Sequence, residues 1–500
     1  MSNKKLTLYA MVAIIVMQLL TIVSGFIIPK IVLTYFGSEV NGLISSISQL
    51  LSYIQLLEGG VNSVAMSVLY KSLADKDYER TNSIIKAIDI FFKKIGIIYI
   101  GFVTVVAIVY PIVVSTSYNY LYVSTLIIVI AAGMFVQYFF ALTYRVLINA
   151  DRRGYIVSIA QCVFIIANLI FALVVARFFR SIHFLKLGTV IAYLIQPIIF
   201  SVYVKKNYPI NIKHAVPDNN ALKQKWDGFG HNLAYFIHAN TDIIVLTALT
   251  NLVMVSIYAV YASIANALKT LLISISASIK PSFGNVLVSS SDEHTNEVFD
   301  FYEIGMSYIT TVLFSCCMVL IVPFVSVYTS NISDTNYYQP LFAFLLCLGE
   351  FVYCLRDPYI SAVYTAGHFK QTAKFAYAEA LMNILISIVL VKRFGIVGVA
   401  VGTLIAMIFR MIAHIFYLKK EILRRSLSKS IKNIVIASLS MCISVLATQQ
   451  IFEFNVQTYL QWFVLGVMCF GTVLVITSII YFVANIKLSR RFFVYYIKRR

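Results

Sequence analysis

Ionisable side chains inside long apolar segments are the residues of this sequence best placed to do chemistry. A charge at the centre of a bilayer costs at least about 2.5 to 3.5 kcal/mol on insertion scales, so it normally faces a cavity or a charged partner. The basic members of this set are Lys30, Arg145, Lys269, Lys280, Arg356 and Arg410. The acidic members are Glu58, Asp242, Glu350, Asp357 and Glu379. We expect these side chains to mark the functional site.

The basic residues could line one cationic cavity for an anionic ligand. Lys269 and Lys280 are eleven positions apart on one apolar segment, so at 100° per residue they project from nearly the same helical face. Arginine offers phosphate oxygens a bidentate fork, and lysine offers them a point charge. The alternative is that Lys30, Arg145 and Lys280 extend to the membrane interfaces. Lys269 and Arg410 lie too deep in their segments for that, which favours the cavity.

The acidic residues have two interpretations, and both stay open. They could bind a coupling cation or a proton, as intramembrane carboxylates do in many transporters. They could instead neutralise basic residues, for example Arg356 with an acid on another helix or Asp242 with a lysine. The sequence shows no metal-ligand spacing, nucleotide-binding loop or nucleophile motif, so we expect no cofactor, no metal and no enzymatic activity.

Composition requires that these residues sit in a membrane protein. Of 500 residues, 60% are hydrophobic and only 12% are charged, and the mean hydropathy is +0.85. These values exclude a chain of soluble domains. The net charge of +19 comes from short clusters of lysine and arginine between apolar runs. That distribution is typical of membrane topology, and it argues against a nucleic-acid-binding face.

Apolar runs of about 20 residues, the length that crosses a bilayer as a helix, recur along the whole chain. They predict an all-α fold of about fourteen transmembrane helices, at 8–36, 42–69, 88–114, 121–147, 155–179, 185–204, 231–249, 253–288, 301–328, 338–365, 372–391, 396–418, 431–451 and 460–486. We therefore divide the chain into a six-helix bundle at 1–204, a cytoplasmic connector at 205–230, a second six-helix bundle at 231–420, and two further helices with a basic tail at 421–500.

The loop charges predict the orientation. Basic segments follow the even-numbered helices, and the loops on the other side are mostly poor in lysine and arginine. The positive-inside rule then places both termini in the cytoplasm. Two loops do not follow the rule in this orientation. Arg177, Arg180 and Lys186 would lie outside, and the acidic segment 289–300 would lie inside.

The two six-helix sets resemble each other. The segment Gly188–Lys206 aligns without gaps on Gly402–Lys420, and Asn168 corresponds to Asn383 one helix earlier. Duplicated halves of this kind are typical of transporters that rock two bundles about a central site. The alternative is chance likeness between apolar helices that end in two lysines, but the shared Gly-Thr, Tyr and Lys-Lys positions favour duplication.

Several segments resemble one known family. They are FIIPKIVLTYFG from Phe26, TDIIVLTALTNLVMVSIYAVYASIANAL from Thr241, IKPSFGNVL from Ile279, and the segment from Arg356 to Thr403 that begins RDPYISAVYTAGHF. These segments and the helix count are similar to those of Wzx-like bacterial polysaccharide flippases, members of the multidrug/oligosaccharidyl-lipid/polysaccharide exporter (MOP) superfamily. The likeness spans most of the chain.

The resemblance implies a MATE-like fold of two six-helix bundles around a central cavity, with two helices outside. It implies a non-enzymatic flippase in the bacterial plasma membrane. The ligand would be an undecaprenyl-diphosphate-linked oligosaccharide unit for O-antigen, capsule or a related polymer, carried outward by alternating access. A polysaccharide polymerase and glycosyltransferases would be the protein partners, and nucleic acid would not be a partner.

Two rival functions make different demands on the sequence. A cation-coupled multidrug or metabolite exporter of the same fold would need an acidic cavity, against which Lys269, Arg356 and Arg410 argue. A membrane-embedded glycan polymerase or ligase would need a large outside loop with catalytic residues. The predicted outside loops are all short, which argues against an enzyme.

Overall fold

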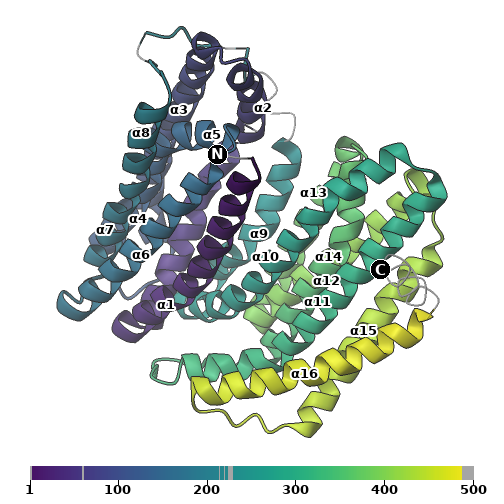
Figure 1. The fold of residues 1–500 in the computed structure, drawn as a ribbon. Coiled ribbons are helices and arrows are strands. Elements are labelled where there is room, and N and C mark those ends of the chain that lie inside the picture. The colour runs from purple at the N-terminus through teal and green to yellow at the C-terminus, as the bar shows by residue number, and fades with distance from the viewer. Residues whose placement is uncertain (1–2, 59–60, 213, 219, 223–228, 487–500) are drawn as a thin grey trace. The chain divides into compact units, whose positions relative to one another are not determined.

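The computed structural model describes residues 3–58, 61–212, 214–218, 220–222 and 229–486 of the chain. Within these residues it is all-helical and holds no strand, so the predicted all-α membrane fold is confirmed. The chain forms two compact units, Met1–Ser256 and Ile257–Arg500 (Figure 1).

Eleven helices of the described residues are long and apolar enough to cross a membrane. Three of the fourteen predicted crossings are not among these eleven. Helix α1 (Asn3–Leu51) is kinked at Gly37, and the predicted second crossing, 42–69, begins in the last part of α1 and ends in α2. Helix α12 (Pro340–Thr365) is long enough but carries Glu350, Arg356 and Asp357. Helix α9 (Phe229–Leu249) supplies only a short apolar stretch among the residues searched.

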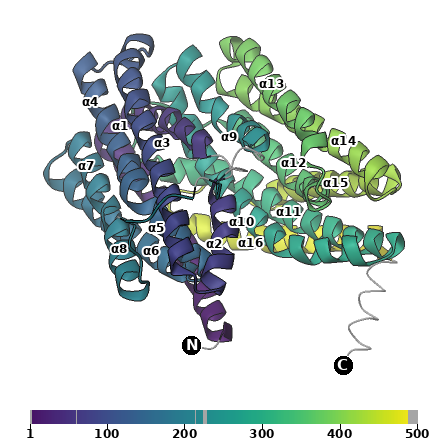
Figure 2. The same cartoon turned by 90° about the horizontal axis from the view of Figure 1, so that it is seen from above.

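The first unit is built on helix α6, which packs against α1, α7 and α8. Figure 2 shows α5, α6 and α8 side by side at one end of this bundle. Its elements after α1 are η1 (Ser52–Glu58), α2 (Val61–Ala74), α3 (Tyr78–Val113), α4 (Tyr120–Val136), η2 (Gln137–Ala141), α5 (Leu142–Ala150), α6 (Gly154–Phe178), α7 (Ile182–Tyr193), α8 (Ile195–Asn207) and α9. Helix α9 contacts α1 and η1, so the compact unit extends beyond the six helices that the sequence assigns to the first bundle.

The second unit is built on helix α11, which contacts α12, α15 and α16. Helices α12 and α13 both pack on α14. The described elements are α10 (Leu252–Ser289), which begins in the first unit, α11 (Asp292–Tyr328), α12, α13 (Phe369–Phe394), α14 (Ile396–Glu421), α15 (Leu427–Ile451) and α16 (Tyr459–Ala484). The last two helices cover one apolar face of α11, where Cys316 and Leu320 pack with Leu465 and Cys469.

Two helices of the first unit are interrupted inside the membrane segment. Between α4 and α5 the chain makes one π-helical turn, η2, and such turns are frequent at functional sites. Between α7 and α8 the regular hydrogen bonding is interrupted at Leu194, whose backbone stays helical and whose N–H donates to the Ile191 carbonyl at 3.1 Å. Pro197 explains the interruption, because its ring lacks an N–H and clashes with the carbonyl of the residue four positions earlier, Tyr193.

Candidate functional site

A polar cavity of about 720 Å³ lies inside the first unit. We call it the amide cavity, because seven of its lining residues carry side-chain amides: Gln18, Gln55, Asn62, Gln137, Asn149, Gln161 and Gln196. Thr21, Tyr138 and Tyr193, whose side chains carry hydroxyl groups, also line it. An amide both donates and accepts hydrogen bonds, so this lining can bind a ligand that does both.

The two helix interruptions bring several of these groups to the cavity. The π-helical turn η2 places the consecutive residues Gln137 and Tyr138 on the cavity wall. Tyr193 and Gln196, three positions apart on either side of the α7–α8 junction, share one helical face and also line the cavity. Gln196 Nε2 donates to Gln161 Oε1 at 2.7 Å, while the buried Nε2 of Gln137 has no hydrogen-bond partner within the described residues. Gln137 is therefore a cavity-lining residue whose amide donor is not used by the described chain.

The charged groups of this wall balance each other. Glu58 and Arg145 are the charged residues among the described lining residues, one of each sign. The Tyr138 hydroxyl donates to Glu58 Oε1 at 2.6 Å. Arg145 is exposed to the cavity, and no carboxylate of the described chain lies within 4 Å of it. A guanidinium that is available beside many amides suits a ligand with both hydroxyl and anionic groups.

In the second unit, two lysines of helix α10 form ion pairs with two acids of helix α12. Lys269 Nζ lies 2.8 Å from Glu350 Oε1, and Lys280 Nζ lies 3.5 Å from Asp357 Oδ1. The two lysines therefore share a face of α10, as their spacing predicts. Asp357 also accepts hydrogen bonds from Ser276 and, at 3.3 Å, from Ser361.

A second charge cluster joins α12, α13 and α14. Glu379 is fully buried and accepts hydrogen bonds from both Arg356 and Arg410, one on each carboxylate oxygen. The Arg356 guanidinium also stacks at 4.4 Å from the ring centre of Tyr353, and Arg410 donates to the Tyr364 hydroxyl at 3.2 Å. Two arginines on one carboxylate leave one excess positive charge. The Nε groups of both arginines are buried without a hydrogen-bond partner among the described residues, so part of the cost of burying this charge stays uncompensated.

The comparisons with known proteins give the architecture. No protein-family model matches the sequence, and the search of curated proteins gives no match. Among solved structures, the chain is similar to "Lipid II flippase MurJ, inward closed conformation", with a TM-score of 0.70 and 16% identity over 95% of this chain and 99% of that one. The fold is that of MurJ and the MATE transporters.

Two further structures support this assignment. The chain superposes on an inward-facing "multidrug resistance MATE family transporter of the MOP superfamily" with a TM-score of 0.67 and 13% identity, covering 85% of this chain and 99% of that chain. A MATE protein in the bent conformation gives 0.56 and 12%, covering 88% and 100%. Identities this low establish the MurJ and MATE fold alone, and function must be argued from the residues.

The structure places the predicted site residues in several environments. Arg145 and Glu58 line the amide cavity. Lys30, which is half-buried, and Asp242, which is buried, belong to the first unit but do not line that cavity. The other basic residues, Lys269, Lys280, Arg356 and Arg410, all meet Glu350, Asp357 or Glu379 inside the second unit. The pairing interpretation of these three acids thus has a geometric basis, and a single cationic cavity stays a prediction.

Sequence reasoning missed the amides. Gln18, Gln137, Gln161 and Gln196 all occur inside apolar segments, where an uncompensated amide is costly to bury. That cost is the signal that could have identified them. It was weaker than the signal from charged residues, because a single amide in a membrane helix often bonds to a neighbouring helix.

Proposed function

We propose that this chain is a flippase of the MOP superfamily that moves an undecaprenyl-diphosphate-linked oligosaccharide unit to the outer leaflet of a bacterial plasma membrane. Transport would proceed by alternating access, with the polyprenyl tail remaining in lipid. The barrier to movement is then the sugar-bearing diphosphate head group. The chain is a multi-pass membrane protein of a transporter fold, which is the setting this function requires.

The observation that carries the proposal is the amide cavity. A sugar presents hydroxyl groups and, in many surface polymers, acetamido groups, each of which donates and accepts hydrogen bonds. Seven amides and three hydroxyl side chains offer the same dual capacity in a space of about 720 Å³. A volume of this size is within the ordinary range for a ligand pocket, which is about 300 to 1,000 Å³.

The diphosphate would be recognised by positive charge. Arg145 supplies an accessible guanidinium beside the amides. In the second unit, four basic residues meet three carboxylates, so this group of charges keeps one positive charge in excess. An inside-negative potential adds about 2.3 kcal/mol per charge per 100 mV toward outward movement of an anion. Coupling to a proton or sodium ion is therefore not obligatory.

The competing candidate is a cation-coupled multidrug or metabolite exporter of the same fold. The half-buried Glu58 carboxylate at the amide cavity favours it, because an acid there could exchange a proton or bind an organic cation. Arg145 on the same wall opposes it, because it cancels the negative charge that an organic cation would need.

The proposal includes an orientation in the membrane, protein partners and a test by gene deletion. Both termini would lie in the cytoplasm, and the polymerase and glycosyltransferases of the same polysaccharide would be the partners. Deletion in the native host should leave sugar-loaded undecaprenyl diphosphate on the cytoplasmic leaflet, measured by accessibility of the glycan to an added lectin in oriented vesicles. Normal surface polymer in the deletion strain, without a second flippase gene, would refute the proposal.

The amide cavity itself is tested by removing one hydrogen-bonded pair. The double variant Gln161→Leu, Gln196→Leu replaces both partners by apolar groups of similar size, which is nearly neutral for folding. We expect complementation of the deletion to fall at least tenfold at equal protein level. Gln450→Leu is the matched control, because Gln450 is an exposed amide near the end of α15. Arg145→Gln should also reduce complementation, by weakening diphosphate binding. Full activity of both cavity variants would exclude the cavity as the site.

A further inference from the structure

A second polar pocket, of about 610 Å³, lies in the second unit at the adjoining ends of two membrane helices. We call it the α15–α16 pocket. Its lining comes from the start of α15 (Lys429, Lys432, Asn433), from the end of α16 (Val483 to Ile486), from Arg425 and from one turn of α11 (Asp300, Glu303, Ile304). It shares no lining residue with the amide cavity, and the proposed transport path makes no use of it.

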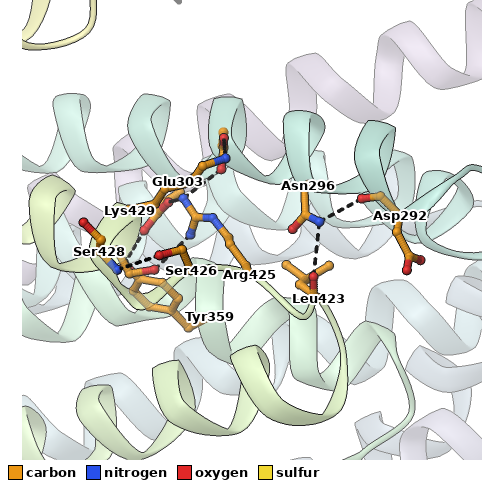
Figure 3. A network of polar contacts seen from close by, with 11 residues as sticks. Asp292, Asn296, Glu303, Tyr359, Leu423, Arg425, Ser426, Ser428 and Lys429 are labelled. Atoms are coloured by element: carbon orange, nitrogen blue, oxygen red, sulfur yellow. Dashed lines mark hydrogen bonds and ion pairs between the residues drawn. The ribbon is translucent and has the colours of Figure 1, made fainter.

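The acidic groups of this pocket are already neutralised. Figure 3 shows Arg425 directed at Glu303, and the same guanidinium lies 2.7 Å from Asp300 Oδ1. Lys429 Nζ donates to Asp300 Oδ2 at 2.8 Å, and the Tyr359 hydroxyl donates to Glu303. Although burial lowers the pKa of Arg425, the two carboxylates outweigh it, and the pKa lies above its usual value. Arg425 therefore stays charged as a fixed part of the wall.

One basic group is left without a counter-charge on this wall. Lys432 uses one of its three N–H donors on the carbonyl oxygen of Ala484, at 2.7 Å, and no carboxylate of the described chain lies within 4 Å of it. The three basic residues Arg425, Lys429 and Lys432 against the two acids Asp300 and Glu303 give a net charge of +1. A ligand with a single negative charge would balance the pocket.

Two amide groups of the wall also lack partners. Asn433 is 6% exposed, and its Oδ1 has no hydrogen-bond partner among the described residues. The same holds for the buried Nδ2 of Asn485. Buried polar groups are nearly always hydrogen-bonded, so an orphaned acceptor and an orphaned donor on one pocket wall indicate an absent ligand. That ligand must supply both a donor and an acceptor.

From this geometry we infer that the α15–α16 pocket binds the head group of an anionic phospholipid, with a phosphodiester and free hydroxyl groups. The phosphate would accept from Lys432 and Asn485, and a head-group hydroxyl would donate to Asn433. Phosphatidylglycerol has this chemistry. The apolar side chains of Ile304, Val483 and Ile486 line the same pocket and suit the start of the acyl chains. Basic pockets between the ends of membrane helices bind anionic lipids in this way.

Lipid binding can be measured on the purified full-length protein in lipid-free detergent. Short-chain phosphatidylglycerol is titrated, and the thermal unfolding midpoint is followed, since a ligand that binds the folded state raises it. We expect a saturable rise that phosphatidylcholine of the same chain length does not reproduce. Lys432→Gln should weaken the apparent affinity about tenfold or more, the usual loss for a charge-assisted hydrogen bond.

Two further variants test whether the effect of Lys432→Gln comes from this pocket. Lys419→Gln makes the same charge change at an exposed lysine at the end of α14, away from the pocket, and should leave the affinity unchanged. Asn433→Asp keeps the side-chain shape but places a negative charge beside the phosphate, so it should also abolish the rise. Equal responses to the two lipids, or equal losses in the Lys419 and Lys432 variants, would overturn the inference. Stabilisation by inorganic phosphate without stabilisation by the lipid would overturn the lipid assignment.

Discussion

Helices α6 to α8 of the first unit and helices α13 and α14 of the second unit use one packing scheme. Thr189 Oγ1 lies 2.8 Å from Asn168 Oδ1, and Thr403 Oγ1 lies 3.1 Å from Asn383 Nδ2. The residue before each threonine is a glycine that lies close to the neighbouring helix. These contacts are made by the residues that align in the sequence, so they give the internal duplication a structural basis.

The two regions differ in what stands eight positions after that glycine. In the first unit it is Gln196, which donates to Gln161. In the second it is Arg410, which shares the Glu379 carboxylate with Arg356. Gln196 and Arg410 thus occupy matching positions in the repeat, one in an uncharged amide pair and the other in a buried ion cluster. The comparison teaches that the repeat fixes where a polar contact between helices must lie, but not whether that contact is charged.

The regions also differ in helix continuity. The first unit breaks between α7 and α8 at Leu194, whereas α14 runs without interruption from Ile396 to Glu421. Pro197 of the first unit aligns with Met411 of the second, and only proline disrupts the helix. Tyr193 and Gln196, on either side of this junction, both line the amide cavity. The aligned segment thus lines a polar cavity in the first unit and contributes to a buried ion cluster in the second.

The largest effect is expected from Glu379→Gln, which removes the carboxylate that two buried arginines share. Breaking a buried ion pair from one side leaves charge uncompensated and costs about 3 to 5 kcal/mol. We expect a correspondingly lower free energy of unfolding, measured by SDS titration in mixed micelles. The matched change in the first unit, Gln161→Leu, removes a neutral partner and should cost about 1 to 3 kcal/mol.

If uncompensated charge causes the loss of stability in Glu379→Gln, removing one of the two arginines should restore part of it. The double variant Glu379→Gln, Arg410→Gln imitates the neutral pair of the first unit and restores the original net charge around Arg356. It should therefore be more stable than Glu379→Gln alone. If the double variant were as unstable as the single one, packing rather than charge would explain the loss, and the contrast between the two regions would fail.

A smaller effect on the free energy of unfolding is expected from alanine at the two aligned glycines, because the helices pack more closely at one than at the other. A Cβ atom at Gly402 would lie 2.4 Å from Ser387 Oγ and 3.0 Å from the Ser387 backbone nitrogen, so the helices must shift. At Gly188 it would lie 3.0 Å from Phe171 Cβ and 3.4 Å from its ring. Overpacking costs about 1 to 3 kcal/mol. Gly402→Ala should fall at the upper end and Gly188→Ala at the lower end, and the reverse order in unfolding titrations would refute this.

Most of the fold was predictable from the sequence. Apolar runs of membrane length recur without large insertions, and burial in lipid leaves helices as the only way to satisfy the backbone of each run. The duplication was also visible, because the Gly-Thr pair, the tyrosine and the paired lysines keep one spacing in both copies. The interruption between the predicted helices 8–36 and 42–69 was visible too, and the structure has a kink there at Gly37, whose φ is 84°.

The site was predictable only in part. Sequence identified Arg356, Arg410 and Glu379 as intramembrane charges, because their cost in lipid is large, but spacing could not show that the three meet. The π-helical turn at η2 has no clear sequence signal, so the joint exposure of Gln137 and Tyr138 to the amide cavity could not be foreseen. Long-range contacts of this kind depend on helix packing, which periodicity does not encode.

The smallest effect should test whether the repeat is energetically symmetric. Thr189→Val and Thr403→Val each remove one hydroxyl of a helix-to-helix hydrogen bond while keeping the side-chain shape. Because Asn168 and Asn383 are both buried, each loss should cost about 1 kcal/mol. Two equal values from unfolding titrations would show that the duplicated contact does the same work in both units. A large loss at Thr403 with none at Thr189 would mean that only the ion-paired copy depends on its threonine, and the shared packing scheme would then be geometric without being energetic.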